Sequence, residues 1–106
     1  MANSRKTAFK VLLKIEQDGA YSNIALDNAV KESELSLLDA AFTSALVYGV
    51  TERKITLDYF IGKYIKGKIK PKVRIALWIG AYQLLFMEKV PSSAAINESV
   101  NLAKQV

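Results

Sequence analysis

The chain has 106 residues, the length of one domain, and 51% of them are hydrophobic, which indicates a globular protein with a core. It contains neither cysteine nor histidine, which excludes disulfides, thiolate zinc sites and catalysis by those side chains. Residues 1–10 lack the apolar core of a signal peptide. The longest uncharged run, residues 75–87, is too short to span a bilayer. We therefore expect a cytoplasmic protein that does not enter membranes.

The formal net charge is +5, and the basic residues are clustered. The first cluster precedes every acidic residue and consists of Arg5, Lys6, Lys10 and Lys14. The second lies between Tyr59 and Met87, a window without Asp or Glu, and consists of Lys63, Lys66, Lys68, Lys70, Lys72 and Arg74. Such clustering favours a polyanionic partner, RNA or DNA, while a solvated lysine-rich surface is the alternative.

Apolar residues follow a helical spacing throughout the chain, and no strand alternation is found. Ser4 is predicted to cap a first helix that runs to about Asp18 and stops at Gly19. A second predicted helix follows Ser22. The inner residues expected for these two helices are Ala8, Leu12 and Ile15 in the first, and Ala25, Leu26, Ala29 and Val30 in the second.

Ser36 and Asp39 form a capping-box pattern at the start of a third helix, which runs toward Gly49. Gly49 is either a helix stop or a point of close contact between helices. A fourth helix is predicted from about Glu52 to Ile65, with Gly67 ending it. Its expected packing residues are Ile55, Leu57, Tyr59, Phe60, Ile61 and Tyr64.

Pro71 suits the first position of a fifth helix, because its missing N–H costs nothing there. The best apolar stripe of the chain follows it: Val73, Ala76, Leu77, Gly80, Ala81 and Leu84. Glycine at position 80 costs about 1 kcal/mol relative to alanine, so we expect another helix to approach Gly80 closely. After a break at Pro91, Ser92 or Ser93 caps a last helix whose expected inner residues are Ile96, Val100 and Ala103. Six helices with short connections predict an all-α bundle.

The acidic residues are scattered, and the glycines form no phosphate-binding loop. We therefore expect neither a metal site nor a nucleotide or S-adenosylmethionine site in this chain. Arg74, Trp78 and Tyr82 are one helical turn apart. They form either a stacking platform for unpaired bases or, as we prefer, a packing contact with Arg74 over the indole.

A series of short motifs keeps a fixed order along the chain: Val47-Tyr48-Gly49-Val50, Leu57-Asp58, Gly80-Ala81-Tyr82-Gln83-Leu84-Leu85-Phe86, Val90-Pro91, Ala94-Ala95, Asn97-Glu98-Ser99-Val100 and Ala103-Lys104. In this order they resemble the NusB-like domain. The run around Gln83, where NusB usually has Glu, is more similar to the version at the N-terminus of the bacterial ribosomal RNA cytosine-C5 methyltransferases of the Sun and Fmu type. The resemblance covers essentially the whole chain and implies an all-α fold of two small helical bundles.

In the family that the chain resembles, the domain usually continues beyond Lys104 into another helix. In the methyltransferases a catalytic domain follows, which binds S-adenosylmethionine and uses two cysteines. The resemblance therefore implies that residues 1–106 are one NusB-like domain, a non-catalytic N-terminal fragment without the final family helix. Removing a terminal helix uncovers apolar surface, so we also expect the fragment to self-associate.

The function implied by the resemblance is to bind or orient ribosomal RNA for the protein's own catalytic domain. Phosphate contacts would supply the affinity, and RNA shape would select the site. The first candidates are Arg5, Lys6 and Lys10, in a region that resembles the basic RNA-contacting segment of NusB. The second are Arg53 and Lys54, and the third are Lys66, Lys68, Lys70, Lys72 and Arg74. Relatives often carry Arg where this chain has Trp78.

Two other functions fit the same residues. One is a stand-alone NusB-type antitermination factor, which would bind RNA together with a small ribosomal protein. The other is a protein–protein module that docks on its own catalytic domain or another protein, in which the basic residues only confer solubility. Gln83 and the Gly-Ala-Tyr run favour the methyltransferase domain over the antitermination factor.

Overall fold

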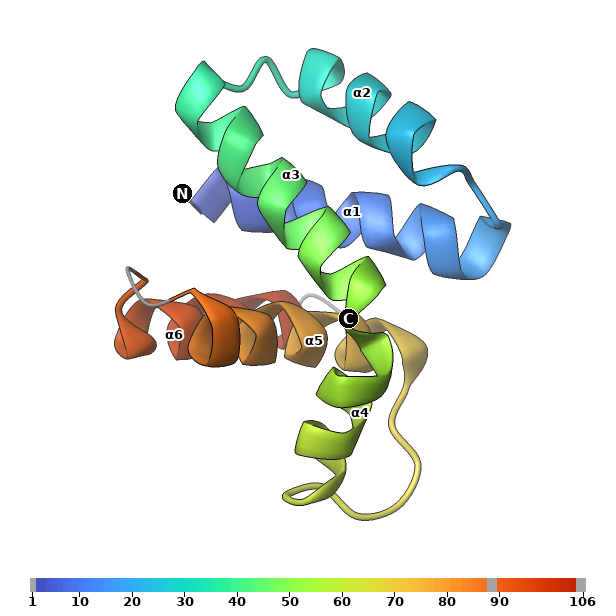
Figure 1. Cartoon of the computed structure of the whole chain (residues 1–106), viewed down its shortest axis with the longest axis vertical. Coiled ribbons are helices and arrows are strands. Elements are labelled where there is room, and N and C mark those ends of the chain that lie inside the picture. The colour runs from blue at the N-terminus through green and yellow to red at the C-terminus, as the bar shows by residue number, and fades with distance from the viewer. Residues whose placement is uncertain (1, 88–89, 105–106) are drawn as a thin grey trace. The chain divides into compact units, whose positions relative to one another are not determined.

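Figure 1 shows the chain as a computed structural model that describes residues 2–87 and 90–104. These residues form six α-helices and no strand, which confirms the predicted all-α class. The helices are α1 (Ala2–Asp18), α2 (Ser22–Glu32), α3 (Leu37–Glu52), α4 (Lys54–Gly62), α5 (Pro71–Phe86) and α6 (Ser92–Lys104). The chain divides into two compact units, Met1–Tyr48 and Gly49–Val106, with the boundary inside α3.

The first unit contains α1, α2 and most of α3. The helices α1 and α2 run side by side in opposite directions, and α3 crosses α1 (Figure 1). The hydroxyl of Thr43 on α3 lies 2.8 Å from the carbonyl oxygen of Asp39 and 3.3 Å from that of Ser4 on α1. The buried apolar residues of this unit include Ala8, Phe9, Val11, Leu12, Ala25, Leu26, Leu46 and Val47. The predicted inner faces of the first two helices are therefore largely confirmed, with Ile15, Ala29 and Val30 only half-buried.

Two of the three predicted helix ends in this unit are confirmed. Gly19 has a φ of +68°, and the next N–H, that of Ala20, donates to the carbonyl of Lys14 at 3.2 Å, which closes α1. The N–H of Asp39 donates to the hydroxyl of Ser36 at 3.2 Å, so Ser36 caps α3. The prediction for Ser4 is wrong, because α1 already begins at Ala2 and the buried Ser4 lies within its first turn.

The second unit is built on α5, which packs against both α4 and α6. Two glycines allow close approaches. Gly49 lies inside α3 rather than at its end, and a Cβ there would overlap the ring of Tyr82 on α5. A Cβ on Gly80 would overlap the hydroxyl of Ser99 on α6 and lie 2.9 Å from its Cβ. The close contact expected at Gly80 is confirmed, and at Gly49 the structure selects close contact over a helix stop.

The fourth predicted helix needs correction. It is shorter than expected, and Gly67, with a φ of +90°, lies in the connection after it rather than at its end. Leu57 and Ile61 are buried as predicted, but Ile55 is 87% exposed, and Tyr59 and Tyr64 are also exposed. The physical reason is that α4 buries only the stripe that contacts α5, and residues four apart share that stripe.

The inner face of the last helix also differs from the prediction. Ile96 and Val100 are about half exposed, whereas Ala95 and Ser99 are buried. Small side chains occupy the contact because α6 lies so close to α5 at Gly80 that larger ones do not fit. Leu84, the last member of the predicted α5 stripe, is exposed as well. The side chain of Ala103 lies outside the described residues.

Candidate nucleic-acid interface

The first basic surface lies on α1. Lys6, Lys10 and Lys14 are exposed and follow one another at intervals of four residues, so they share one side of the helix. Lys14 was not among the predicted contacts, although the same interval would have identified it. Arg5 differs from its neighbours, because it is only 4% exposed and its guanidinium carbon lies 5.2 Å from the ring centroid of Phe42 on α3. Its burial favours packing over direct contact with a phosphate.

A polar hollow of about 260 Å³ lies beside this row, between α1 and α2. Its lining includes Lys10 and Lys14 together with Thr7 and Ser33, whose hydroxyls are 3.4 Å apart. Ammonium and hydroxyl groups are donors that suit a phosphate oxygen, although Glu32 on the same lining opposes an anion. The lining therefore combines donors for an anion with one carboxylate that repels it.

The second candidate pair lies at the start of α4. Arg53 occupies the N-cap position, and its guanidinium carbon lies 4.3 Å from the ring centroid of Phe86, the last residue of α5. The ammonium of Lys54 lies 5.9 Å from the ring centroid of Trp78. Both distances fall within the range of cation–π attraction, so α4 and α5 hold these basic side chains against aromatic faces.

Trp78 is part of the core rather than of a binding surface. It is 3% exposed, and its indole N–H donates to a carboxylate oxygen of Asp58 at 2.7 Å. The same oxygen lies 3.5 Å from Nε of Arg74. The packing interpretation of Trp78 is therefore confirmed, but the cation over the indole is Lys54 and not Arg74. Arg74 is half exposed and already paired with Asp58, which leaves it less suited to bind a phosphate.

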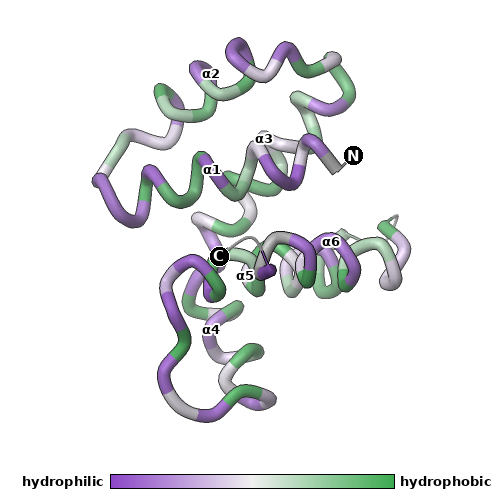
Figure 2. The backbone as a smooth tube through the Cα atoms, turned by 180° about the vertical axis from the view of Figure 1, so that it is seen from behind, coloured by the Kyte–Doolittle hydropathy of each residue, from purple (hydrophilic) through white to green (hydrophobic). Residues whose placement is uncertain are grey.

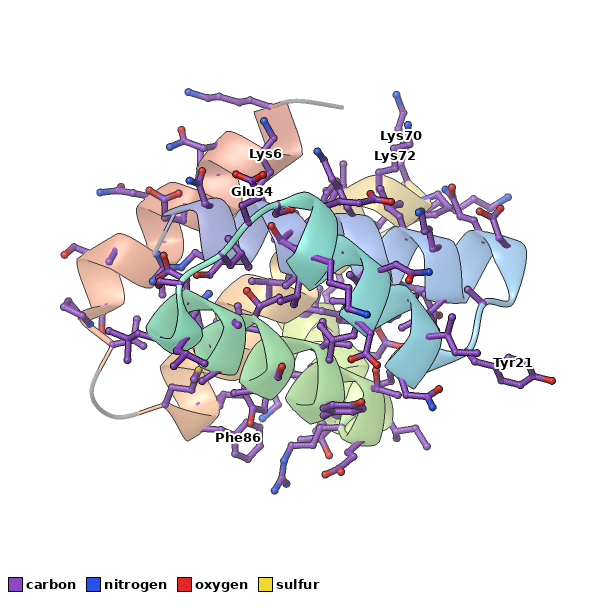
Figure 3. All side chains as sticks on the ribbon, turned by 90° about the horizontal axis from the view of Figure 1, so that it is seen from above. Lys6, Tyr21, Glu34, Lys70, Lys72 and Phe86 are labelled. Atoms are coloured by element: carbon purple, nitrogen blue, oxygen red, sulfur yellow. The ribbon has the colours of Figure 1, made fainter. Side chains whose placement is uncertain are left out.

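The third candidate set follows α4. Lys66 and Lys68 are exposed in the connection, Lys70 is the N-cap residue of α5, and Lys72 lies in its first turn. Figure 2 shows hydrophilic segments recurring along this connection, and Figure 3 shows the side chains of Lys70 and Lys72 pointing outward. Cations near a helix N-terminus oppose the helix dipole, so helix stability does not account for this placement.

An apolar groove of about 420 Å³ lies between α4, α5 and α6. Its lining includes the exposed side chains of Tyr64, Leu84, Ile96 and Val100. Lys104 is also part of the lining. An exposed apolar surface of this kind is suited to packing against another protein segment. Tyr64, Ile96 and Val100, which were predicted to be core residues, therefore form part of the lining of this groove.

The described residues offer no other chemical site. Within residues 2–87 and 90–104, no group of three or more carboxylates could hold a metal ion. None of the helices described there has the length and apolar character needed to cross a bilayer. The chain as a whole has no cysteine and no histidine. The features that remain are the basic surfaces, the aromatic–cation contacts and the apolar groove.

The chain is similar to the first part of two ribosomal RNA methyltransferases. The chain is 41% identical over 102 residues to the probable ribosomal RNA small subunit methyltransferase B of Bacillus subtilis, and the match covers 94% of this chain and 23% of that protein. A protein of the same description from Synechocystis is 40% identical over 107 residues, with 98% and 24% covered. The chain thus spans about a quarter of the length of these two relatives.

Transcription antitermination proteins are also similar. The chain is 33% identical over 106 residues to the NusB protein of Ruminiclostridium cellulolyticum, with 96% of this chain and 73% of that protein covered. No solved structure matches. The NusB family model matches residues 2–106. The chain therefore belongs to the NusB family.

Proposed function

We propose that the chain is the RNA-binding domain of a ribosomal RNA methyltransferase and that it binds or orients ribosomal RNA for a separate catalytic domain. The observation that carries the proposal is the set of exposed lysines Lys66, Lys68, Lys70 and Lys72. None of them belongs to the core, and Lys70 and Lys72 oppose the dipole of α5. The two methyltransferase relatives, in which the match covers only about a quarter of the protein, support a domain that works beside another one.

The mechanism is electrostatic. Each ammonium or guanidinium group that meets a phosphate releases a condensed counterion, and this release supplies affinity that falls as salt rises. Lys6 and Lys10 on α1, and Lys66, Lys68, Lys70 and Lys72 around the start of α5, are the exposed direct contacts in this proposal. Arg5 holds α1 against Phe42 and supports its neighbours, and Arg74 assists from its pair with Asp58. Arg53 and Lys54 act from the aromatic faces on which they rest.

S-adenosylmethionine and the cytosine chemistry belong, in this proposal, to the catalytic domain and not to residues 1–106. The residues of this chain do not fit that cofactor or that reaction, because they include no cysteine nucleophile and no glycine-rich loop. The domain's contribution is therefore to bind the substrate and to orient it.

The proposal is tested by neutralising one lysine at a time. Lys68→Gln removes an exposed charge from the connection, and Lys31→Gln removes an exposed charge from the last turn of α2, outside every candidate set. We expect Lys68→Gln to weaken binding of a ribosomal RNA fragment and to reduce the salt slope by about 1. Lys31→Gln is the matched control and should change neither. Equal effects of the two substitutions would contradict the assignment of the surface.

A second candidate function is that of a stand-alone antitermination factor. It is favoured by the 33% identity to a NusB protein of which the match covers 73%. Sequencing the parent reading frame past Val106 separates the two candidates. A further stretch of some hundreds of codons that includes a glycine-rich turn and two cysteines supports the methyltransferase. A stop codon within about one more helix supports the antitermination factor.

A docking role is a third candidate, and the apolar groove between α4, α5 and α6 favours it. In this role the groove accepts a segment of the catalytic domain or of another protein, and the lysines only maintain solubility. A domain that docks without contacting RNA shows no RNA binding at about 50 mM salt, where phosphate contacts are strong.

A further inference from the structure

Arg53, Phe86 and Tyr82 form a layered stack at the junction of α4 and α5. The guanidinium carbon of Arg53 lies 4.3 Å from the ring centroid of Phe86. The Phe86 ring lies 5.4 Å from the ring of Tyr82, centroid to centroid, with 33° between their planes. Tyr82 in turn rests against Gly49, where any side chain would overlap its ring. The stack therefore starts from a backbone surface in α3 and ends with the guanidinium.

The outer part of this stack is exposed. Phe86 is 38% exposed although it is a large apolar residue at a helix end, and Arg53 is exposed beside it. Figure 3 shows Phe86 projecting from the end of α5. The Phe86 ring therefore has a planar cation within cation–π distance, and both groups are accessible from solvent.

We propose that this exposed pair is a stacking site for an unpaired RNA base, which lies on the guanidinium plane of Arg53 while Phe86 holds that plane in position. The inference rests on the proposed RNA-binding function and extends it from phosphate contact to contact with bases. Proteins bind unpaired bases on aromatic rings and on arginine planes, because every base has a flat face. The charge of Arg53 also attracts the phosphates that accompany the base.

A second exposed aromatic–cation pair provides the comparison. The ammonium of Lys63 lies 4.8 Å from the ring centroid of Tyr59 on α4, and Tyr59 is exposed. Lysine carries a compact charge without a plane, so this pair offers no second flat surface over the ring. We therefore assign base stacking to the Arg53 pair and treat the Tyr59 pair as its matched control.

The test compares two single strands of equal length and charge, oligouridine RNA and the corresponding abasic strand. Both carry the phosphates, but only the first carries bases. We expect the wild-type chain to bind oligouridine at least about fivefold more tightly than the abasic strand, the lower end of the known range for one stacked base. Arg53→Lys and Phe86→Leu should each remove this preference, while Tyr59→Leu should keep it.

Arg53→Lys keeps the charge and changes an exposed position, so it should leave the fold intact. It therefore tests whether the planar guanidinium is needed for base stacking, even if Phe86→Leu unfolds the second unit. The proposal is overturned if the wild-type chain binds the two strands equally or if Arg53→Lys keeps the preference. If the wild-type chain binds the two strands equally and its affinity still falls as salt rises, the proposed RNA-binding function remains supported. If the wild-type chain binds neither strand at about 50 mM salt, the proposed function fails together with the stacking site.

Discussion

The close packing of α5 on α6 predicts the effect of adding one methyl group at Gly80. Glycine inside a helix costs about 1 kcal/mol relative to alanine, so Gly80→Ala should stabilise the protein if the new methyl group has room. The structure gives it none, since the added Cβ overlaps the hydroxyl of Ser99 and lies 2.9 Å from its Cβ.

The sign of the net effect follows from which atom has to move. Carbon atoms in contact are normally about 3.5–4.0 Å apart. The Ser99 hydroxyl can rotate away, but its Cβ is fixed to the backbone of α6, so the two helices must separate by roughly 0.6–1 Å. Overpacking of this kind costs about 1–3 kcal/mol. The gain in helix propensity offsets about 1 kcal/mol of this cost, so we expect Gly80→Ala to lower the free energy of unfolding by about 0–2 kcal/mol.

Urea unfolding followed by tryptophan fluorescence measures this change in the relevant unit, because Trp78 is the single tryptophan and is buried on α5. Gly62→Ala is the matched control, since no atom lies within 4 Å of the Cβ added at this last residue of α4. We expect Gly62→Ala to be neutral or slightly stabilising. Adding Ser99→Gly to Gly80→Ala should relieve the overlap and give a favourable interaction free energy. A Gly80→Ala variant as stable as Gly62→Ala would show that α5 and α6 leave room for the added methyl group.

Three further predictions concern the other features of the structure. Asp58→Ala removes the acceptor of the buried Trp78 indole N–H, and we expect a loss of about 1–3 kcal/mol in urea unfolding; an unchanged midpoint would contradict the assigned hydrogen bond. Lys6→Ala should weaken RNA binding without lowering thermal stability. Arg5→Ala should lower the melting temperature, because it removes packing on Phe42. If binding and melting experiments show the opposite for the two variants, these separate roles of Lys6 and Arg5 are wrong. The chain should self-associate through its apolar groove, which Val100 lines. Light scattering in concentrated solution should therefore give a lower apparent mass for Val100→Lys than for the wild type, and a monomeric wild type would contradict this prediction.

The sequence was sufficient to predict the six helices and most of their starts. Pro71, Gly19 and the Ser36–Asp39 pair act through local backbone geometry, which neighbouring residues alone determine. The close approach at Gly80 was also predictable, since a helix-interior glycine without a partner is unfavourable. The absence of a capping role for Ser4 was not predictable, because α1 begins two residues earlier and helix boundaries shift by one or two residues around a local signal.

Side-chain burial was harder to predict where a helix contacts only one neighbour. An apolar stripe shows which residues share a face, but it does not show how much of that face a neighbour covers. Ile96 and Val100 lie on such a face of α6 and line an open groove instead of a core. The candidate basic residues were predictable from charge alone, but the burial of Arg5 and the stacking of Arg53 on Phe86 depend on contacts between residues that are distant in sequence.

If this domain binds RNA through its exposed lysines, its affinity for RNA must fall as the salt concentration rises. The measurement is the fluorescence anisotropy of a labelled single-stranded ribosomal RNA fragment, titrated with the chain between about 50 and 200 mM salt. If the six exposed lysines Lys6, Lys10, Lys66, Lys68, Lys70 and Lys72 each meet one phosphate, the logarithm of the affinity should fall linearly with the logarithm of salt, with a slope of about −4. Binding that does not change with salt, or no binding at about 50 mM, would show that the exposed lysines do not bind RNA phosphates.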